Sequence, residues 1–374
     1  MSRLTHRERV QAMLNGEKLD RPVVDLGGFV NSFSVPAYLD FKASLGLGRK
    51  LDREKVSMIN TISKMDERVL EYLEIPFRRV FPSVSAFYEP NFQEDGSFID
   101  EWGITLKPVS HYYARLGAPL KDATISDLDD YPWPDADDVT RYFGLADQVY
   151  NLFEDTDYSL VGASIWSGIF QQCWYLRGMD TFLMDLVINP DFALALLERV
   201  TNIYIHLLEK FLKITGQYLD FVETADDLGG QNGPLISPKL YRSMIKPFHA
   251  KLFETIHKHS KAKVFYHTCG AVMPLIDDLI DIGVDILNPI QPLPKMAPEE
   301  LHARWGDRLI FHGGLDVQHL LPMGTPKDIR QEVRHYLDVF SPKRFILSPA
   351  NTILPGTPPK NIVAAFKAAK NYRR

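Results

Sequence analysis

The second part of the chain alternates between short apolar segments and longer amphipathic segments. The apolar segments, each typical of a buried strand, are 158–163, 218–223, 263–267, 285–288, 309–312 and 345–348. The amphipathic segments, each typical of a helix, are 141–153, 179–186, 191–214, 238–259, 272–282, 298–304, 326–339 and 359–370. An alternation of this kind favours βα units with a parallel sheet over an all-helical or all-strand fold.

Two further strand candidates lie earlier in the chain, at 23–26 and 79–81. Together with the six above they make about eight strands, each followed by a helix, which predicts a (β/α)8 TIM barrel. A doubly wound open sheet is the alternative, but no Gly-x-Gly-x-x-Gly pattern follows the first strand. The 374 residues are enough for one large domain, and we predict a single barrel domain over 1–374.

The first part of the chain departs from the alternation. A helical extension is predicted over 5–15, where Thr5 and Glu8 have the spacing of a capping box. Helical periodicity also runs over 50–73.

Two segments are predicted to lie outside the barrel itself. An inserted β-hairpin is expected at about 92–107, with its turn at Asp95-Gly96, and would cover one end of the barrel. The acidic, Pro-rich stretch at about 122–139 is interpreted as a solvated surface connection. A metal or ligand role for these acids is the alternative.

Charge and cysteine content exclude several classes of partner. The chain has 42 basic and 48 acidic residues, a net charge of −6, and no basic block, which argues against nucleic acid and anionic membranes. No apolar run is long enough for a membrane span, and residues 1–6 lack an apolar signal segment. Cys173 and Cys269 cannot form a disulfide framework, so we expect a cytoplasmic protein.

Polar residues gather where the predicted strands end. In a barrel these positions line one mouth, where active sites lie. Candidates for catalysis are Asp226, Asp227 and His312, and candidates for substrate binding are Asp25, Trp166, Asn288, Gln291 and Asn351. Asp226 and Asp227 could instead bond within a turn. One turn cannot satisfy two adjacent acids, so we expect at least one of them to face the pocket.

His267 and Cys269 follow the strand predicted at 263–267. Residues two apart in an extended segment point the same way, so both side chains can face one pocket. Imidazole and thiolate are typical metal ligands. A packed pair without a metal is the alternative interpretation.

Several segments carry a shared family pattern: 5–14, 20–22, 100–103, 226–231, 236–242, 283–291, 313–316, and His-Thr-Cys-Gly at 267–270. In these the chain resembles the uroporphyrinogen decarboxylase superfamily, including its corrinoid-linked methyltransferase branch. The resemblance covers nearly the whole chain and implies a (β/α)8 barrel.

The resemblance separates two branches of that superfamily. True decarboxylases have an N-terminal Met-Arg-Gln-Ala-Gly-Arg segment whose arginines bind the carboxylates of the substrate. The corresponding stretch here, 25–31, reads Asp-Leu-Gly-Gly-Phe-Val-Asn and has no arginine. A tetrapyrrole with eight carboxylates needs fixed cations in its pocket. The chain is therefore closer to the methyltransferase branch, and uroporphyrinogen is not the expected substrate.

The methyltransferase branch typically binds zinc through a His-x-Cys pair and a second cysteine after the last strand. His267 and Cys269 match the pair, but Asn351 stands where the second cysteine is expected. A site of Glu223, His267 and Cys269 with an open fourth position remains sound, because catalytic zinc commonly has three protein ligands. The resemblance further implies a small methylated substrate, a corrinoid carried by a partner protein, and compatibility with a homodimer.

Three functions compete at this point. The first is methyl transfer within a corrinoid-dependent demethylation system with zinc activation. The second is a metal-independent decarboxylase of a smaller carboxylic acid, which would use Asp226, Asp227 or His312. Arg78 and Arg79 could then clamp carboxylates, although surface or structural pairing is the favoured role of these two arginines. The third is a binding barrel without catalysis, against which stands the number of polar residues at the strand ends.

Overall fold

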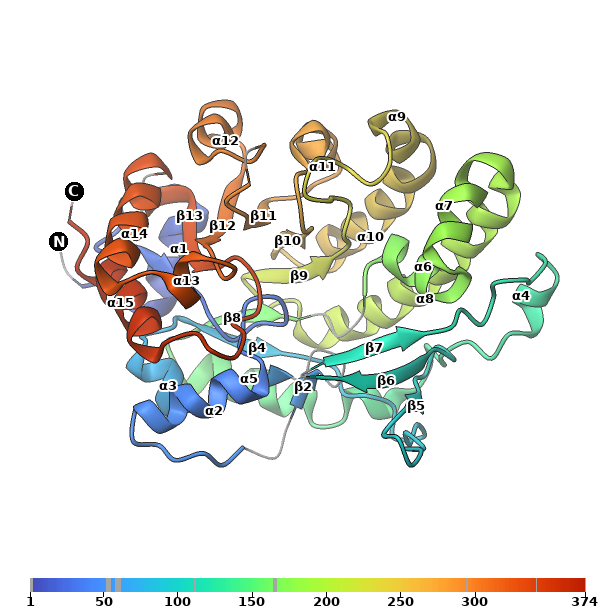
Figure 1. Cartoon of the computed structure of the whole chain (residues 1–374), viewed down its shortest axis with the longest axis horizontal. Coiled ribbons are helices and arrows are strands. Elements are labelled where there is room, and N and C mark those ends of the chain that lie inside the picture. The colour runs from blue at the N-terminus through green and yellow to red at the C-terminus, as the bar shows by residue number, and fades with distance from the viewer. Residues whose placement is uncertain are drawn as a thin grey trace.

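The computed structural model describes residues 3–51, 55–57, 62–110, 112–163, 167–293, 295–340 and 342–373. Its centre is an eight-stranded sheet in the order β1-β13-β12-β11-β10-β9-β8-β4, with every ladder parallel. The strands are β1 (Val23–Val24), β4 (Phe77–Val80), β8 (Ser159–Gly162), β9 (Phe221–Ala225), β10 (Lys263–His267), β11 (Ile286–Ile290), β12 (Ile310–Leu315) and β13 (Phe345–Pro349). The sheet curls on itself with helices outside it (Figure 1), which confirms the predicted (β/α)8 barrel.

The helices of the second part follow the predicted segments closely. They are α5 (Leu145–Asp155), α6 (Ile169–Arg177), α7 (Met179–Ile188), α8 (Pro190–Thr215), α9 (Pro238–Leu240), α10 (Lys246–His259), α11 (Ile276–Asp281), α12 (Pro298–Trp305), α13 (Leu320–Met323), α14 (Pro326–Phe340) and α15 (Pro359–Lys370). A π-helical turn, Tyr241–Ile245, joins α9 to α10. Within the described ranges, no helix combines the length and apolar character that a bilayer crossing requires.

The N-terminal extension is helix α1 (His6–Leu14), and its capping box is present as predicted. The Glu8 amide donates to Thr5 Oγ1 at 3.2 Å, and the Thr5 amide donates to Glu8 Oε2 at 2.8 Å. Helix α2 (Val35–Ser44) was not predicted.

The helix predicted over 50–73 was wrong. The described part of this range contains two short strands, β2 (Lys55–Ser57) and β3 (Ile62–Ser63), and only its end is helical, in α3 (Glu67–Tyr72). The carboxylate of Asp66 accepts the Arg68 amide at 3.0 Å and so caps a new helix at this point. Residues 52–54 and 58–61 of the range lie outside the described residues.

The insertion is a three-stranded antiparallel sheet of β5 (Phe98–Ile99), β6 (Thr105–Val109) and β7 (Tyr112–Leu116) (Figure 1). The predicted inserted hairpin is present as β5 and β6, but a third strand extends the insertion to Leu116, beyond the predicted range of 92–107. Asp100 Oδ1 accepts the amides of Trp102 and Ile104, both at 2.9 Å, which places the β5–β6 turn after Asp100. The Asp95-Gly96 turn precedes the sheet. The acidic connection contains helix α4 (Asp127–Asp130), anchored by buried Leu128.

The barrel interior has an aromatic floor below a polar layer. The rings of Phe77 and Phe221 lie 5.3 Å apart, and those of Phe221 and Phe265 lie 5.7 Å apart. The His312 ring packs edge-on to Phe265 at 5.0 Å. The polar residues at the strand ends therefore lie next to a layer of packed aromatic rings, at the end of the barrel where sites are expected.

Candidate functional site

Three potential metal ligands converge beyond the ends of β9 and β10. One ligand atom from each of Asp227, His267 and Cys269 lies within 4.8 Å of the other two. His267 Nε2 is 3.2 Å from Cys269 Sγ and 3.6 Å from Asp227 Oδ1. Asp227 Oδ1 also accepts the Cys269 amide at 2.9 Å, which ties the two loops together.

This donor set fits zinc. It offers one nitrogen, one sulfur and one carboxylate oxygen, the three-ligand pattern of catalytic zinc with a position left for substrate. Burial, followed by the neighbouring Asp227 carboxylate, raises the pKa of the Cys269 thiol well above its usual value. A divalent cation would reverse this preference, because a coordinating thiol is deprotonated by the metal.

A line of buried hydrogen bonds runs from His267 across the barrel. His267 Nδ1 bonds Asn288 Oδ1, and Asn288 Nδ2 lies 2.7 Å from His312 Nδ1. His312 Nε2 is 2.9 Å from Asp25 Oδ2. Asp25 and His312 are fully buried, and Asn288 and His267 nearly so. Four residues from four different strand ends thus form one connected network.

Arg79 on β4 fixes the far end of this network. Its guanidinium donates to Asp25 Oδ1 at 3.2 Å, to Asp25 Oδ2 at 2.6 Å and to Glu223 Oε1 at 2.9 Å. Burial alone would raise the pKa of Asp25, but the Arg79 charge and the His312 hydrogen bond outweigh it and hold that pKa well below its usual range. Asp25 is therefore an ionised acceptor.

Glu223 is placed differently from the predicted ligand position. It lies opposite Phe265 in the β9–β10 register, one pleat below Ala225, which lies opposite His267. The Glu223 side chain contacts Arg79. The acid that lies beside His267 is Asp227, which follows the end of the strand. Burial raises the pKa of Glu223, although Arg79 opposes the shift. Its Oε2 atom is buried with no hydrogen-bond partner among the described residues.

The two adjacent acids, Asp226 and Asp227, have different surroundings. Asp227 is half-exposed beside the ligand group, while Asp226 is buried and accepts the amides of Phe170 at 2.6 Å and Gln171 at 2.8 Å. His249 Nε2 lies 2.9 Å from the same carboxylate. Asp226 thus binds the start of α6 and packs away from the mouth, which does not match its candidate catalytic position.

The candidate substrate residues have varied surroundings. Gln291 Oε1 accepts the Gly270 amide at 2.7 Å and so holds the turn after Cys269. Asn351 Nδ2 lies 3.5 Å from Cys269 Sγ, and its Oδ1 accepts the Thr352 amide at 2.7 Å. Trp166 lies outside the described residues.

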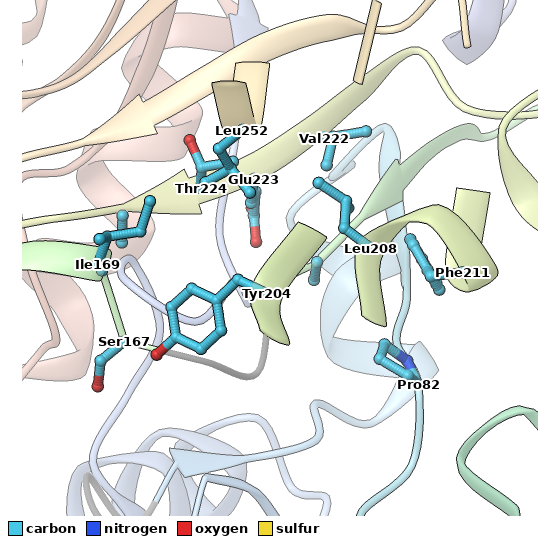
Figure 2. A pocket seen from close by; sticks show the side chains of 13 residues that line it. Pro82, Ser167, Ile169, Tyr204, Leu208, Phe211, Val222, Glu223, Thr224 and Leu252 are labelled. Atoms are coloured by element: carbon cyan, nitrogen blue, oxygen red, sulfur yellow. The ribbon is translucent and has the colours of Figure 1, made fainter. Parts of the chain in front are cut away.

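A small cavity of about 30 Å³ adjoins Glu223. Figure 2 shows Ser167, Ile169 and Tyr204 at one end of it and Phe211 and Pro82 at the other. The space is enough for a water molecule or a methyl-sized group.

Sequence reasoning considered surface or structural pairing and a carboxylate clamp as roles of Arg79, but it did not identify Asp25 and Glu223 as the partners. It also missed Asn31, which donates to Asp25 Oδ2 at 2.9 Å. A signal for Arg79 was available. It is one of two adjacent arginines in a strand that begins with Phe77 and ends with Val80, and a buried charge requires partners.

Comparisons with known proteins identify relatives among both decarboxylases and methyltransferases. The uroporphyrinogen decarboxylase (URO-D) family model matches residues 99–372. A uroporphyrinogen decarboxylase of Synechococcus sp. is 26% identical over 185 residues, which are 47% of this chain and 50% of that protein. The chain also spans about half of such an enzyme from Prochlorococcus marinus, 47% of its length. A methylated-thiol–coenzyme M methyltransferase of Methanosarcina mazei is 22% identical over 253 residues, 67% of this chain and 65% of that protein.

A solved structure, a methyltransferase from Methanosarcina mazei, shares the fold with a TM-score of 0.67 at 18% identity, over 98% of both chains. The family model extends from the inserted sheet to the last helix and covers most of the sequence. The chain belongs to the uroporphyrinogen decarboxylase (URO-D) family.

Proposed function

We propose that this chain is a methyltransferase that acts on a small methylated substrate at a zinc ion held by Asp227, His267 and Cys269. The convergence of these three ligand atoms within 4.8 Å carries the proposal. The similarity to a methylated-thiol–coenzyme M methyltransferase supports the reaction class. A corrinoid on a separate partner protein, taken from the same branch of the family, completes the proposed system.

The bound zinc would act as a Lewis acid that lowers the pKa of a substrate thiol or withdraws charge from an ether oxygen. The chain's own residues position and shield that chemistry. Asn351 directs its amide group at Cys269 Sγ, and a hydrogen bond to sulfur reduces the charge that a thiolate donates. Gln291 and Asp227 hold the Cys269 loop through backbone amides.

The decarboxylase alternative is less well supported, because the cations it needs are already engaged. Arg79 is shared by Asp25 and Glu223. Arg78 pairs with Glu67 and packs over the Tyr158 ring at 3.5 Å. Neither guanidinium is free to clamp a substrate carboxylate, and Asp226 is occupied by α6 and His249.

Metal analysis tests the proposal. We expect protein purified without added metal to contain about one zinc per chain, as a three-ligand site implies. Cys269→Ser and Asp227→Asn should lose most of it, whereas Glu223→Gln should keep it and Asp307→Asn, an exposed control, should match wild type. Wild-type protein that takes up no zinc, or a folded His267→Ala variant that transfers methyl groups from a methylated thiol to cob(I)alamin at the wild-type rate, would contradict the proposal.

A further inference from the structure

We propose that Asp25 sets the tautomer of His267 through two intermediate side chains, His312 and Asn288, so that His267 Nε2 presents a bare lone pair to Cys269 and Asp227. Asp25 and His312 are then positioning residues, remote from the reacting atoms. The inference deepens the proposed function and rests on it for its purpose, since the lone pair is what a metal would bind. The hydrogen-bond assignment itself needs no metal.

The assignment starts at Asp25, which can only accept. Two neighbouring side chains can only donate to it and make three contacts: the Arg79 guanidinium at 2.6 and 3.2 Å and the Asn31 amide nitrogen at 2.9 Å. The Arg79 charge keeps the carboxylate ionised. The fourth contact, His312 Nε2 at 2.9 Å, must therefore carry a hydrogen.

The next two bonds follow in turn. Burial lowers the pKa of His312, against the opposing effect of Asp25, so the neutral ring with a bare Nδ1 is favoured. A bare Nδ1 accepts, so Asn288 must direct its NH₂ group toward it, at 2.7 Å. The carbonyl oxygen of Asn288 then faces His267 Nδ1, and that nitrogen must be the donor.

The consequence appears at the ligand group. With its hydrogen on Nδ1, a neutral His267 has no hydrogen on Nε2, the atom 3.2 Å from Cys269 Sγ and 3.6 Å from Asp227 Oδ1. The opposite tautomer would point an N–H bond at the ligand group and could not coordinate there. Partners that orient a ligating histidine in this way typically affect metal affinity 10–100-fold.

The rings in this network have little freedom to rearrange. His312 packs edge-on to Phe265 at 5.0 Å, and the backbone carbonyl of Asn288 accepts the Thr268 amide at 2.8 Å, which fixes the backbone from which the Asn288 side chain extends. Rotating the Asn288 amide by half a turn would set its NH₂ against His267 Nδ1 and its oxygen against the bare nitrogen of His312. Only one orientation satisfies every buried group.

Two pairs of variants separate this network from simple packing. Asn288→Leu removes both bonds at the centre, whereas Asn288→Asp keeps an acceptor for His267 Nδ1. His312→Leu breaks the link to Asp25, whereas His312→Gln can still donate to Asp25 and accept from Asn288. Within each pair, the first variant should lose the tautomer preference and the second should retain it.

The measurement is the ¹⁵N chemical shift of both ring nitrogens of His267 in the full, metal-free chain at pH 8, assigned by comparison with His267→Gln. In wild type, Asn288→Asp and His312→Gln, Nδ1 should have a pyrrole-type shift and Nε2 a pyridine-type shift. The two leucine variants should give averaged shifts. Their zinc dissociation constants, measured by competition with a chromophoric chelator, should rise about 10–100-fold, while those of the conservative variants change little.

A wild-type His267 with its hydrogen on Nε2, or leucine variants with unchanged ring shifts, would overturn the inference. Because the tautomer is read without metal, a wild-type chain that shows the expected shifts but binds no zinc refutes the proposed function alone. Circular dichroism checks the fold of each variant, and either variant pair is sufficient to decide.

Discussion

Arg79 Nη2 lies 2.6 Å from Asp25 Oδ2, across the junction of the barrel where, among the described residues, no backbone ladder joins β1 to β4. Elsewhere in the barrel, neighbouring strands are joined by parallel ladders. At this junction a charged pair from the two strand ends makes the connection. The same guanidinium also holds Glu223, so a single cation serves two buried acids.

Replacing Arg79 with methionine should therefore be costly. Breaking a buried ion pair by removing one partner leaves uncompensated charge, and a loss of roughly 3–5 kcal/mol in the free energy of unfolding is expected. Urea denaturation followed by circular dichroism measures it. Arg199→Met, which removes an exposed pair with Asp129, is the control and should cost less than about 1 kcal/mol. Equal losses in the two variants would argue against the role of Arg79.

Glu223 should make stability depend on pH in a direction opposite to that of Asp25. Its pKa is raised in the folded state, so the folded protein binds its proton more tightly than the unfolded chain does. The stability from this proton is fully present below the unfolded value of about pH 4.3 and is lost as pH rises through the folded pKa. The difference in unfolding free energy, wild type minus Glu223→Gln, should thus fall as pH rises above about 4.3. A difference that stays constant would show that Glu223 does not titrate in this way.

Introducing a thiol at position 351 should strengthen the proposed metal site. Asn351 approaches Cys269 Sγ at 3.5 Å, so a cysteine side chain there would lie beside the ligand group. Under reducing conditions we expect Asn351→Cys to bind zinc at least ~10-fold more tightly, the effect of about 1.4 kcal/mol. Asn351→Ala removes the amide without adding a ligand and should not reproduce the gain. The dissociation constant from chelator competition decides between them.

Asp226→Ala should destabilise the fold more than any nearby surface change. It leaves two amides of α6 and the ring of His249 without their buried acceptor. Each unsatisfied buried donor costs about 1–3 kcal/mol, so a total loss of about 3 kcal/mol or more is expected. Asp307→Ala, an exposed substitution, should stay within about 0.5 kcal/mol. Thermal and urea unfolding of the two variants provide the test.

The sequence was sufficient for the barrel because the strand and helix periods are strong from residue 141 onward. It failed between 50 and 73, where a local cap at Asp66 overrides an apparent helical period. The polar residues of the mouth were also identifiable from their places after strands. The hydrogen-bond and ion-pair partners of these residues could not be identified from the sequence, because the register of the strands decides which side chains meet. Glu223 and Asp227 are four residues apart, and only the fold shows which of them stands level with His267.

The hydrogen-bond order of the network lies further beyond sequence reasoning. Asp25 and His312 are 287 positions apart, and nothing in the chain indicates that their side chains meet. The expectation that at least one of Asp226 and Asp227 faces the pocket rested on chemistry alone, since one turn cannot satisfy both acids.

Gln171, in the first turn of α6, contacts both of these acids: its amide donates to Asp226 Oδ1 at 2.8 Å, and its side chain donates to Asp227 Oδ2 at 2.9 Å. Gln171 thus links the start of α6 to the Asp227 carboxylate. A displacement of α6 relative to the sheet would therefore shift the position of the Asp227 carboxylate. Substitutions along α6, out of reach of any ligand, can therefore retune the pocket by shifting that carboxylate.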